Sequence, residues 1–412
     1  MHVNRVFRST YHDTADRRLG RSGVALRRRL ENGKSTWEVE LPEAPGHVAV
    51  AAPGGPAGPP PLIADLLQAI VRQGELVEIA AVQTERSDDL HDEVALLENG
   101  SVVDRFVRNG REDDPGLAVI ETGPVGPLPE KPSTRALIQA RFEEQYSEIL
   151  AHDPGTRLGD EPEALHKQRV AVRRLRALLR SAEPMLDPVW ANQLREELGW
   201  LGRSLGNVRD LDVLLVHLRQ EVRALEGEDR SAGLQLIAAL DEERTVARAE
   251  LVRALGSARY LTLLARLEEA VPGPRWVGDD IPVEGLARKS FRKLAKAANA
   301  LGKDATDEEL HAVRIRAKRA RYAGELAETV AGKPATRFVQ RARELQDVIG
   351  EHQDAVVAEE RLRAAATKAH TPQAAISVGR LVERERLRRR RSRARVPKAW
   401  RKLERAGRQA WR

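Results

Sequence analysis

The spacing of apolar residues changes about one third of the way along this chain. Up to about residue 120, short segments rich in β-forming residues alternate with turn-forming residues, which is typical of strands. From about residue 135 onward, apolar residues recur every three to four positions, which predicts long amphipathic helices. The pattern therefore predicts a multidomain α+β protein in which a β-rich part precedes an all-α part.

The β-rich part contains four segments that predict strands and one that predicts a helix. We expect the strands at 35–41, 76–84, 91–97 and 101–107, and the helix at 63–71. Asn99 and Gly100 favour a type I′ turn, so the last two strands are expected to form a hairpin. Residues 51–61 are rich in proline and glycine and predict a loop.

The helical part is predicted to contain helices at 134–152, 163–186, 190–222 and 234–255, with further helices after a Pro/Gly-rich break at 271–282. Ser133 or Thr134 can cap the first of them. The expected organisation is a β domain at 1–122, a linker at 123–134, a helical domain at 135–382 with repeats at about 135–270 and 284–382, and a basic tail at 383–412.

One predicted helix carries a row of cations. At 100° per residue, His166, Arg169, Arg173, Arg176 and Arg180 fall within an arc of about 80°. The opposite face is apolar, so the helix can pack normally. Neighbouring like charges on one helix face repel each other, and a solvated face usually includes acids. The row therefore predicts an anionic partner.

The same pattern occurs twice. Residues 165–176 match 310–321, and residues 201–214 match 345–358, which pairs Gly206 with Gly350 and Asp210 with Asp354. In the first match His166, Arg169, Arg173, Arg174 and Arg176 correspond to His311, Arg314, Lys318, Arg319 and Arg321. Two copies of a cationic row suggest the two halves of one groove.

Phosphate binding explains these rows best, because arginine offers forked donors to phosphate oxygens and lysine a point charge. A row of this length suits a linear polyanion better than a mononucleotide, and no GxxxxGK[ST] motif is present. The alternative is that the arginines pair with acids on neighbouring helices, and Asp210, Asp212 and Asp354 are candidate partners.

Charge is unevenly distributed along the chain. The net charge is +7, yet residues 384–412 contain fourteen arginines and lysines against two glutamates, so the remainder is net negative. The absence of cysteine excludes disulfides and thiolate zinc sites and fits a cytoplasmic protein. We find no apolar run of about 18 residues and no signal-peptide pattern, so no membrane span is expected.

The two His/Arg/Lys motifs, each followed by Gly-x-x-x-Asp, resemble the CHAD domain, the conserved-histidine α-helical domain, over about 135–380. The resemblance implies two pseudo-symmetric four-helix bundles that bind inorganic polyphosphate through a basic groove. It implies that polyphosphate binds to both matched sets of five residues given above, the set that begins at His166 and ends at Arg176 and the set that begins at His311 and ends at Arg321. Arg180 continues the first row, and helical spacing adds Lys289, Arg292, Lys293 and Lys296.

Residues 11–42 resemble the CYTH family, the triphosphate tunnel metalloenzymes, in which a closed antiparallel tunnel binds triphosphate. Arg27 and Arg29 match the family's phosphate-binding arginines. The opening Glu-x-Glu-x-Lys strand is not found, Glu40 replaces an expected lysine, and the alternating glutamates of a later strand are missing. Only Glu38, Glu40 and Glu121 stand as stray candidates for metal binding. We therefore expect a truncated, degenerate tunnel-like domain with no catalytic residues, metal site or cofactor.

The leading hypothesis is a polyphosphate-binding protein without catalysis, in the cytoplasm or on polyphosphate-containing granules. One alternative is a metal-dependent inorganic triphosphatase or polyphosphatase that uses the N-terminal domain. The other is a nucleic-acid-binding protein that uses the basic tail. The tail itself is either a solvated, partly helical extension or a second polyanion contact.

Overall fold

The computed structural model describes residues 5–43, 46–86, 91–98, 101–109, 132–160, 162–302, 304–367 and 372–411. The chain forms two compact units. The first contains residues 1–127, 146–171 and 252–265, and the second contains 128–145, 172–251 and 266–412. Most of the predicted linker and the candidate Glu121 lie outside the described residues.

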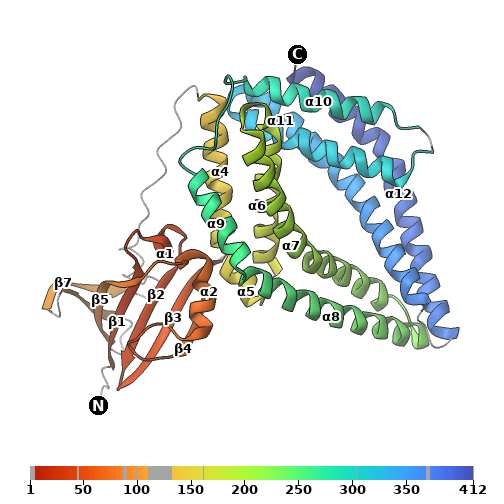
Figure 1. Cartoon of the computed structure of the whole chain (residues 1–412). Coiled ribbons are helices and arrows are strands. Elements are labelled where there is room, and N and C mark those ends of the chain that lie inside the picture. The colour runs from red at the N-terminus through yellow and green to blue at the C-terminus, as the bar shows by residue number, and fades with distance from the viewer. Residues whose placement is uncertain are drawn as a thin grey trace. The chain divides into compact units, whose positions relative to one another are not determined.

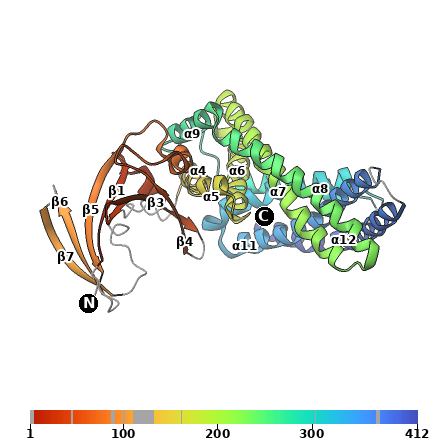
Figure 2. The ribbon, with the colours of Figure 1, turned by 90° about the horizontal axis from the view of Figure 1, so that it is seen from below.

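The largest element of the first unit is an antiparallel sheet. Its described strands are β1 (Arg5–Thr14), β2 (Ala25–Glu31), β3 (Lys34–Glu43), β4 (Gly46–Pro53), β5 (Leu76–Arg86), β6 (His91–Glu98) and β7 (Ser101–Asn109). The strand order is β4-β3-β2-β1-β5-β6-β7, and the strands bend into an arc that stays open between β4 and β7 in the described part of the chain (Figure 2). This arrangement is compatible with a tunnel-like domain.

All four predicted strands are confirmed, as β3, β5, β6 and β7. Glu98 lies opposite Ser101, as the predicted hairpin requires, although Asn99 and Gly100 themselves lie outside the described residues. The predicted loop at 51–61 was wrong for residues 51–53, which end β4. Pairing with β3 extends the strand up to Pro53, whatever the composition of its last three residues.

The core of the first unit lies between the sheet and a short helix. This helix, α2 (Pro61–Val71), confirms the prediction and packs against β3, β4 and the four-residue α1 (Arg18–Arg21). Trp37 is fully buried, and its indole N–H donates to the backbone oxygen of Gly55 at 2.9 Å. The Pro/Gly-rich loop is therefore held in place by a core tryptophan.

Helices make up the rest of the described chain (Figure 1). They are α4 (Thr134–Ala151), α5 (Asp153–Leu158), α6 (Pro162–Ser181), a 3-10 turn (Glu183–Met185), α7 (Pro188–Arg223), α8 (Gly227–Leu255), α9 (Ala258–Ala270), α10 (Val283–Asn299), α11 (Asp307–Ala366) and α12 (Pro372–Ala410). The four predicted helices are confirmed as α4, α6, α7 and α8. The grouping of these helices into two four-helix bundles stays a prediction.

The most extensive packing between two elements of the second unit is that of α11 against α12, which lie side by side (Figure 1). Helix α11 is kinked at Gly332, which has a φ of 58°, and Pro334 follows two residues later. The glycine adopts this left-handed conformation readily, and the proline cannot donate a helical hydrogen bond. No helix in the described chain is long and apolar enough to cross a membrane.

Candidate functional site

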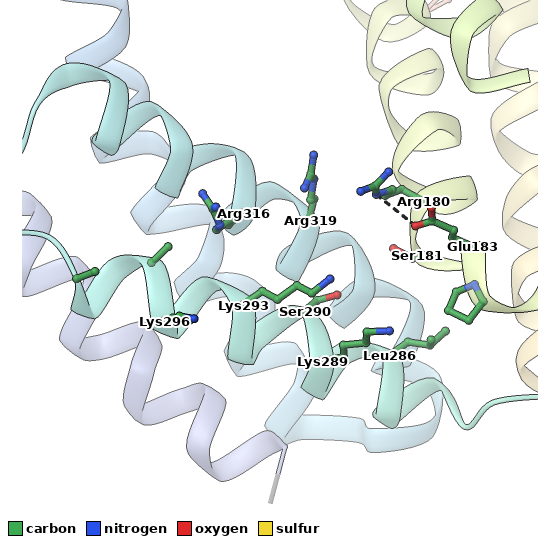
Figure 3. Close-up of a pocket in the computed structure, with 13 residues that line it drawn as sticks. Arg180, Ser181, Glu183, Leu286, Lys289, Ser290, Lys293, Lys296, Arg316 and Arg319 are labelled. Carbon is green, nitrogen blue, oxygen red and sulfur yellow. Dashed lines mark ion pairs between the residues drawn. The ribbon is translucent and has the colours of Figure 1, made fainter. Parts of the chain in front are cut away.

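A cavity of about 560 Å³ in the second unit is lined by cations from three helices (Figure 3). Arg180 comes from α6, and Glu183, which follows that helix, pairs with it at 3.5 Å. The other cationic lining residues are Lys289, Lys293 and Lys296 of α10, and Arg316 and Arg319 of α11. Glu183 is the one acid among the described lining residues, so the cavity holds a large excess of positive charge.

The apolar pattern of each helix sets the direction of these cations. In α10 the buried positions Leu286 and Leu294 leave Lys289, Lys293 and Lys296 exposed on another face. In α11, Ala317 and Ala320 are fully buried and Arg319 is exposed. Small buried residues let α11 approach its neighbours closely, and the long basic side chains between them reach the cavity.

Electrostatic repulsion connects the arginines of the cavity to further arginines on α6 and α7. The pKa of Arg319 is lowered, first by partial desolvation and then by the charges of Arg180, Arg316 and Arg195. The pKa of Arg195 on α7 is lowered by desolvation and by Arg180. Desolvation followed by the charges of Arg195 and Arg203 likewise lowers the pKa of Arg176.

We call this set the basic belt. It consists of Arg203, Arg176, Arg195, Arg180, Arg319, Arg316 and the cavity lysines Lys289, Lys293 and Lys296. Its members come from α6, α7, α10 and α11, so both sequence repeats contribute. Glu183 and Glu196 offset part of this charge, and the remaining excess of positive charge in one place is well suited to bind an anion.

In each half of the helical part an arginine lies close to a glycine, although the repeat does not pair these positions. A Cβ added at Gly199 of α7 would lie 3.4 Å from the Arg176 guanidinium, and one added at Gly350 of α11 would lie 3.6 Å from that of Arg314. Gly199 therefore leaves room for an arginine of α6, and Gly350 for an arginine from the part of α11 that precedes the kink. His311, next to Arg314 on the same row, contacts the Gln353 side-chain oxygen at 3.1 Å through Nδ1.

The remaining predicted residues lie outside the cavity. Arg174 lines a second cavity of about 220 Å³ that also contains acids, and Arg321 pairs with Glu325 of that cavity at 3.6 Å. Arg292 is exposed on α10. Arg173 and Lys318 are half-buried in the second unit, and His166 and Arg169 are half-buried in the part of α6 that belongs to the first unit.

Acidic side chains of the protein are the alternative partners for the predicted rows of cations, and the structure places only some of them near those rows. Asp212 pairs with Arg244 of α8 at 2.5 Å and not with an arginine of the two predicted cation rows. The pKa of Asp354 is raised by desolvation and by the charge of Asp210, while Arg314 and Arg388 lower it. The two repeat-related aspartates are thus close enough to interact, and the second lies near an arginine of the row.

The arginines of the N-terminal sheet lie next to carboxylates. Arg27 donates to Glu38 at 2.7 Å and pairs with Glu40 at 3.3 Å, and Arg29 pairs with Glu31 at 3.0 Å. Glu40, the residue found in place of an expected lysine, thus neutralises one of the two arginines. A phosphate would have to displace these carboxylates, so residual phosphate binding here stays a prediction. The described residues contain no cluster of three or more potential metal ligands.

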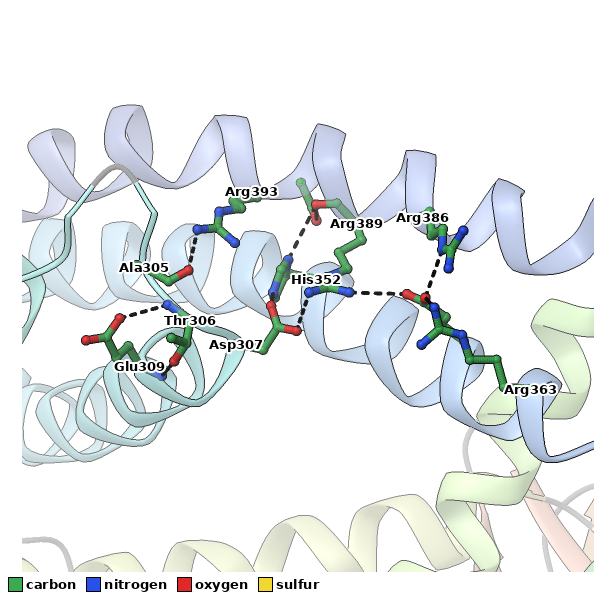
Figure 4. A network of polar contacts seen from close by, with 11 residues as sticks. Ala305, Thr306, Asp307, Glu309, His352, Arg363, Arg386, Arg389 and Arg393 are labelled. Atoms are coloured by element: carbon green, nitrogen blue, oxygen red, sulfur yellow. Dashed lines mark hydrogen bonds and ion pairs between the residues drawn. The ribbon is translucent and has the colours of Figure 1, made fainter.

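Of the two interpretations of the tail, a solvated extension does not fit the described residues, because residues 383–410 belong to α12 and this helix packs on α11. Figure 4 shows arginines of α12 in a polar network with α11. Glu359 accepts hydrogen bonds from Arg386 at 3.0 Å and Arg389 at 3.2 Å, and Arg389 also reaches Asp307 at 2.5 Å. These acidic partners lie far from α12 in the sequence. The local sequence around the arginines therefore gives no indication that they are paired.

Three members of the belt, Arg195, Arg203 and Arg316, are not among the residues predicted from the sequence. A signal was present for the first two, because Arg195, Gly199 and Arg203 are spaced four residues apart and lie along one helix face. Arg316 lies away from the row that begins at His311, so the repeat directed attention to a different face of α11.

Comparison with known proteins identifies the family. The model of the CHAD domain matches residues 140–363. The chain belongs to the CHAD domain family. Two uncharacterized proteins of Mycobacterium tuberculosis are each 28% identical to it over 473 aligned residues, which cover 98% of this chain and 90% of theirs.

Two solved structures resemble this CHAD protein. The crystal structure of the CHAD domain from the plant Ricinus communis has a TM-score of 0.51 and 27% identity, covering 68% of this chain and 93% of that one. PptA from Streptomyces chartreusis has a TM-score of 0.56 and 22% identity, covering 66% of this chain and all of its own. The latter similarity concerns the fold alone.

Proposed function

We propose that the second unit binds inorganic polyphosphate along the basic belt. The observation that carries this proposal is the cavity, in which six cations from α6, α10 and α11 face one acid. Arginine and lysine are the side chains that bind phosphate oxygens through forked and point-charge contacts. Polyphosphate binding through a basic groove is also what the CHAD family implies.

The extent of the belt favours a chain of phosphates over a single phosphate. Its cations are distributed over four helices, and Arg176, Arg195 and Arg319 are each repelled by other arginines of the belt. A linear polyanion can neutralise all of them at once and release its counterions, which gives a steep dependence of affinity on salt. We propose no role for a cofactor.

The double variant Lys293→Gln with Arg319→Gln tests this proposal. Each lost charge-assisted contact is worth about 1.5–3 kcal/mol, so the loss of two should weaken the binding of long-chain polyphosphate at least about a hundredfold. The slope of log affinity against log salt should become shallower by about 1.4, taking about 0.7 per phosphate contact. Fluorescence anisotropy with labelled polyphosphate measures both quantities.

The matched control is Arg219→Gln with Arg361→Gln, which removes the same charge from exposed ion pairs with Asp241 and Glu243. Unchanged affinity in a folded belt variant, or an equal loss in the control, would exclude the belt as the binding site. Phosphate release in the presence of Mg²⁺ should be followed in the same samples. Turnover of triphosphate would establish the enzymatic alternative instead.

A further inference from the structure

The C-terminal half of α12 presents a basic face outside the belt. Arg391, Arg395, Lys398, Lys402 and Arg405 follow one another at steps of four and three residues and fall within an arc of about 80°. All five are exposed. At 1.5 Å per residue the row is about 21 Å long. None of these residues lines either of the two cavities of the second unit described above.

The two halves of α12 differ in how their cations are balanced. In the N-terminal half, arginines pair with acids of other helices or of α12 itself, as in Arg380 with Asp229, Arg384 with Glu221, Arg386 with Glu359, Arg388 with Glu385 and Arg389 with Asp307. In the other half, Arg395 pairs with Glu351 at 2.6 Å. Within the described residues, Arg391, Lys398, Lys402 and Arg405 have no acidic partner. We call these four residues the α12 stripe.

Packing on the opposite face holds the stripe in place. Val396, Trp400 and Leu403 are buried, and the Trp400 indole N–H donates to the Asn299 side-chain oxygen at 2.7 Å. The stripe therefore stays on a fixed helix rather than on a free tail. Its neighbouring like charges destabilise the helix, and a bound polyanion would relieve that repulsion.

The chemistry of the face favours phosphate groups over nucleobases. Recognition of single-stranded nucleic acid commonly uses aromatic side chains on which bases stack. Trp400 and Trp411, the two aromatic residues of this segment, are both buried. What the face offers a ligand is positive charge at regular intervals, which complements a chain of phosphates without bases.

We propose that the α12 stripe is a second polyphosphate-binding face of this protein. This proposal rests on the proposed function for its ligand, inorganic polyphosphate. The stripe has no residue in common with the basic belt. A short oligophosphate that fills the belt would leave the stripe unoccupied, whereas long-chain polyphosphate supplies enough charge for both faces.

The triple variant Lys398→Gln, Lys402→Gln and Arg405→Gln tests the stripe in the full-length protein. Its control is Arg219→Gln, Arg337→Gln and Arg361→Gln, which removes three exposed arginines elsewhere in the second unit. The probes are long-chain inorganic polyphosphate, triphosphate, and single-stranded RNA of matched charge. Circular dichroism and thermal unfolding establish that both variants fold.

We expect the stripe variant to bind long-chain polyphosphate about ten- to a hundredfold more weakly at low salt, with a salt slope shallower by about 2. Its affinity for triphosphate should be unchanged, because the belt is intact. The control should bind both as the wild type does. Equal losses in the stripe variant and the control would overturn the proposal, as would a loss confined to RNA, which would make nucleic acid the occupant.

The belt variant Lys293→Gln with Arg319→Gln, measured alongside, separates the two proposals. If it abolishes long-chain binding and the stripe variant changes nothing, the stripe is refuted and the belt stands. If the stripe variant loses affinity and the belt variant does not, the belt is refuted and the stripe stands.

Discussion

Replacing Arg319 by glutamine should stabilise the free protein while weakening its response to polyphosphate. Arg319 is repelled by Arg180, Arg316 and Arg195, and Glu183 acts on it in the opposite sense. Two repulsions are therefore left uncompensated. Exposed charge pairs are worth about 0.3–0.5 kcal/mol each after solvent screening, so their removal should contribute roughly 0.5–1 kcal/mol.

The expected change in melting temperature follows from this free energy. For a domain of 150–250 residues, 1 kcal/mol corresponds to about 2–4 °C, so Arg319→Gln should melt roughly 1–4 °C higher at low salt. Glutamine and arginine have similar helix propensities, so the helix itself should be little affected. The difference should vanish near 1 M salt, where the Debye length is only about 3 Å.

Addition of long-chain polyphosphate should invert the order of the two proteins. A ligand that binds only the folded state stabilises it in proportion to the logarithm of its concentration over its dissociation constant. The wild type, which binds more tightly, should therefore gain more. Thermal unfolding by differential scanning fluorimetry, with and without polyphosphate, measures both effects.

Arg337→Gln, an exposed arginine farther along α11, is the matched control. A lower melting temperature for Arg319→Gln at low salt, or the same rise in Arg337→Gln, would show that the belt carries no uncompensated repulsion. A stabilisation that persists at high salt would show that its origin is not electrostatic.

Two further predictions concern α12. Glu359→Gln should cost about 2–3 kcal/mol in urea unfolding at neutral pH, because it weakens charged hydrogen bonds from Arg386 and Arg389. Burial raises the pKa of Glu359, but Arg386, Arg363 and Arg389 lower it overall. The stability that the Glu359 carboxylate contributes is therefore present above the ordinary glutamate pKa and is lost as the pH falls through the lowered value. A difference in stability between wild type and variant that widened in acid would contradict this role of Glu359. Gly407→Ala should destabilise the protein by about 1–2 kcal/mol because its Cβ would collide with the Phe291 ring. Gly379→Ala, with open space around it, should instead stabilise the same helix by up to about 1 kcal/mol, and equal effects at both positions would show that the Phe291 contact is unimportant.

The secondary structure was largely predictable because it depends on local periodicity. The helices and the strands at 35–41 and 76–84 follow from the spacing of apolar residues, and the internal repeat located α6 and the first part of α11. The end of β4 was missed because pairing with β3, rather than its own composition, extends it to Pro53.

The cation set was only partly predictable, because a cavity depends on which helices meet. Lys293 and Arg180 were found from helical spacing, whereas Arg316 and Arg195 reach the belt through packing that no local pattern encodes. The pairing of Arg389 with Asp307 joins residues 82 positions apart. The net charge of the sequence segment alone therefore could not show that arginines in the N-terminal half of α12 are neutralised by acids.

The packing of α12 on α11 also bears on how the protein is made. Helix α11 is complete before the ribosome has polymerised the 39 residues of α12, which at 5–20 residues per second takes about 2–8 s. During that interval the apolar face of α11, together with the carboxylates of Asp307 and Glu359, lacks its partner. Nascent chains are therefore expected to need chaperone protection at this stage, and slow codons within 372–410 would lengthen the period of exposure.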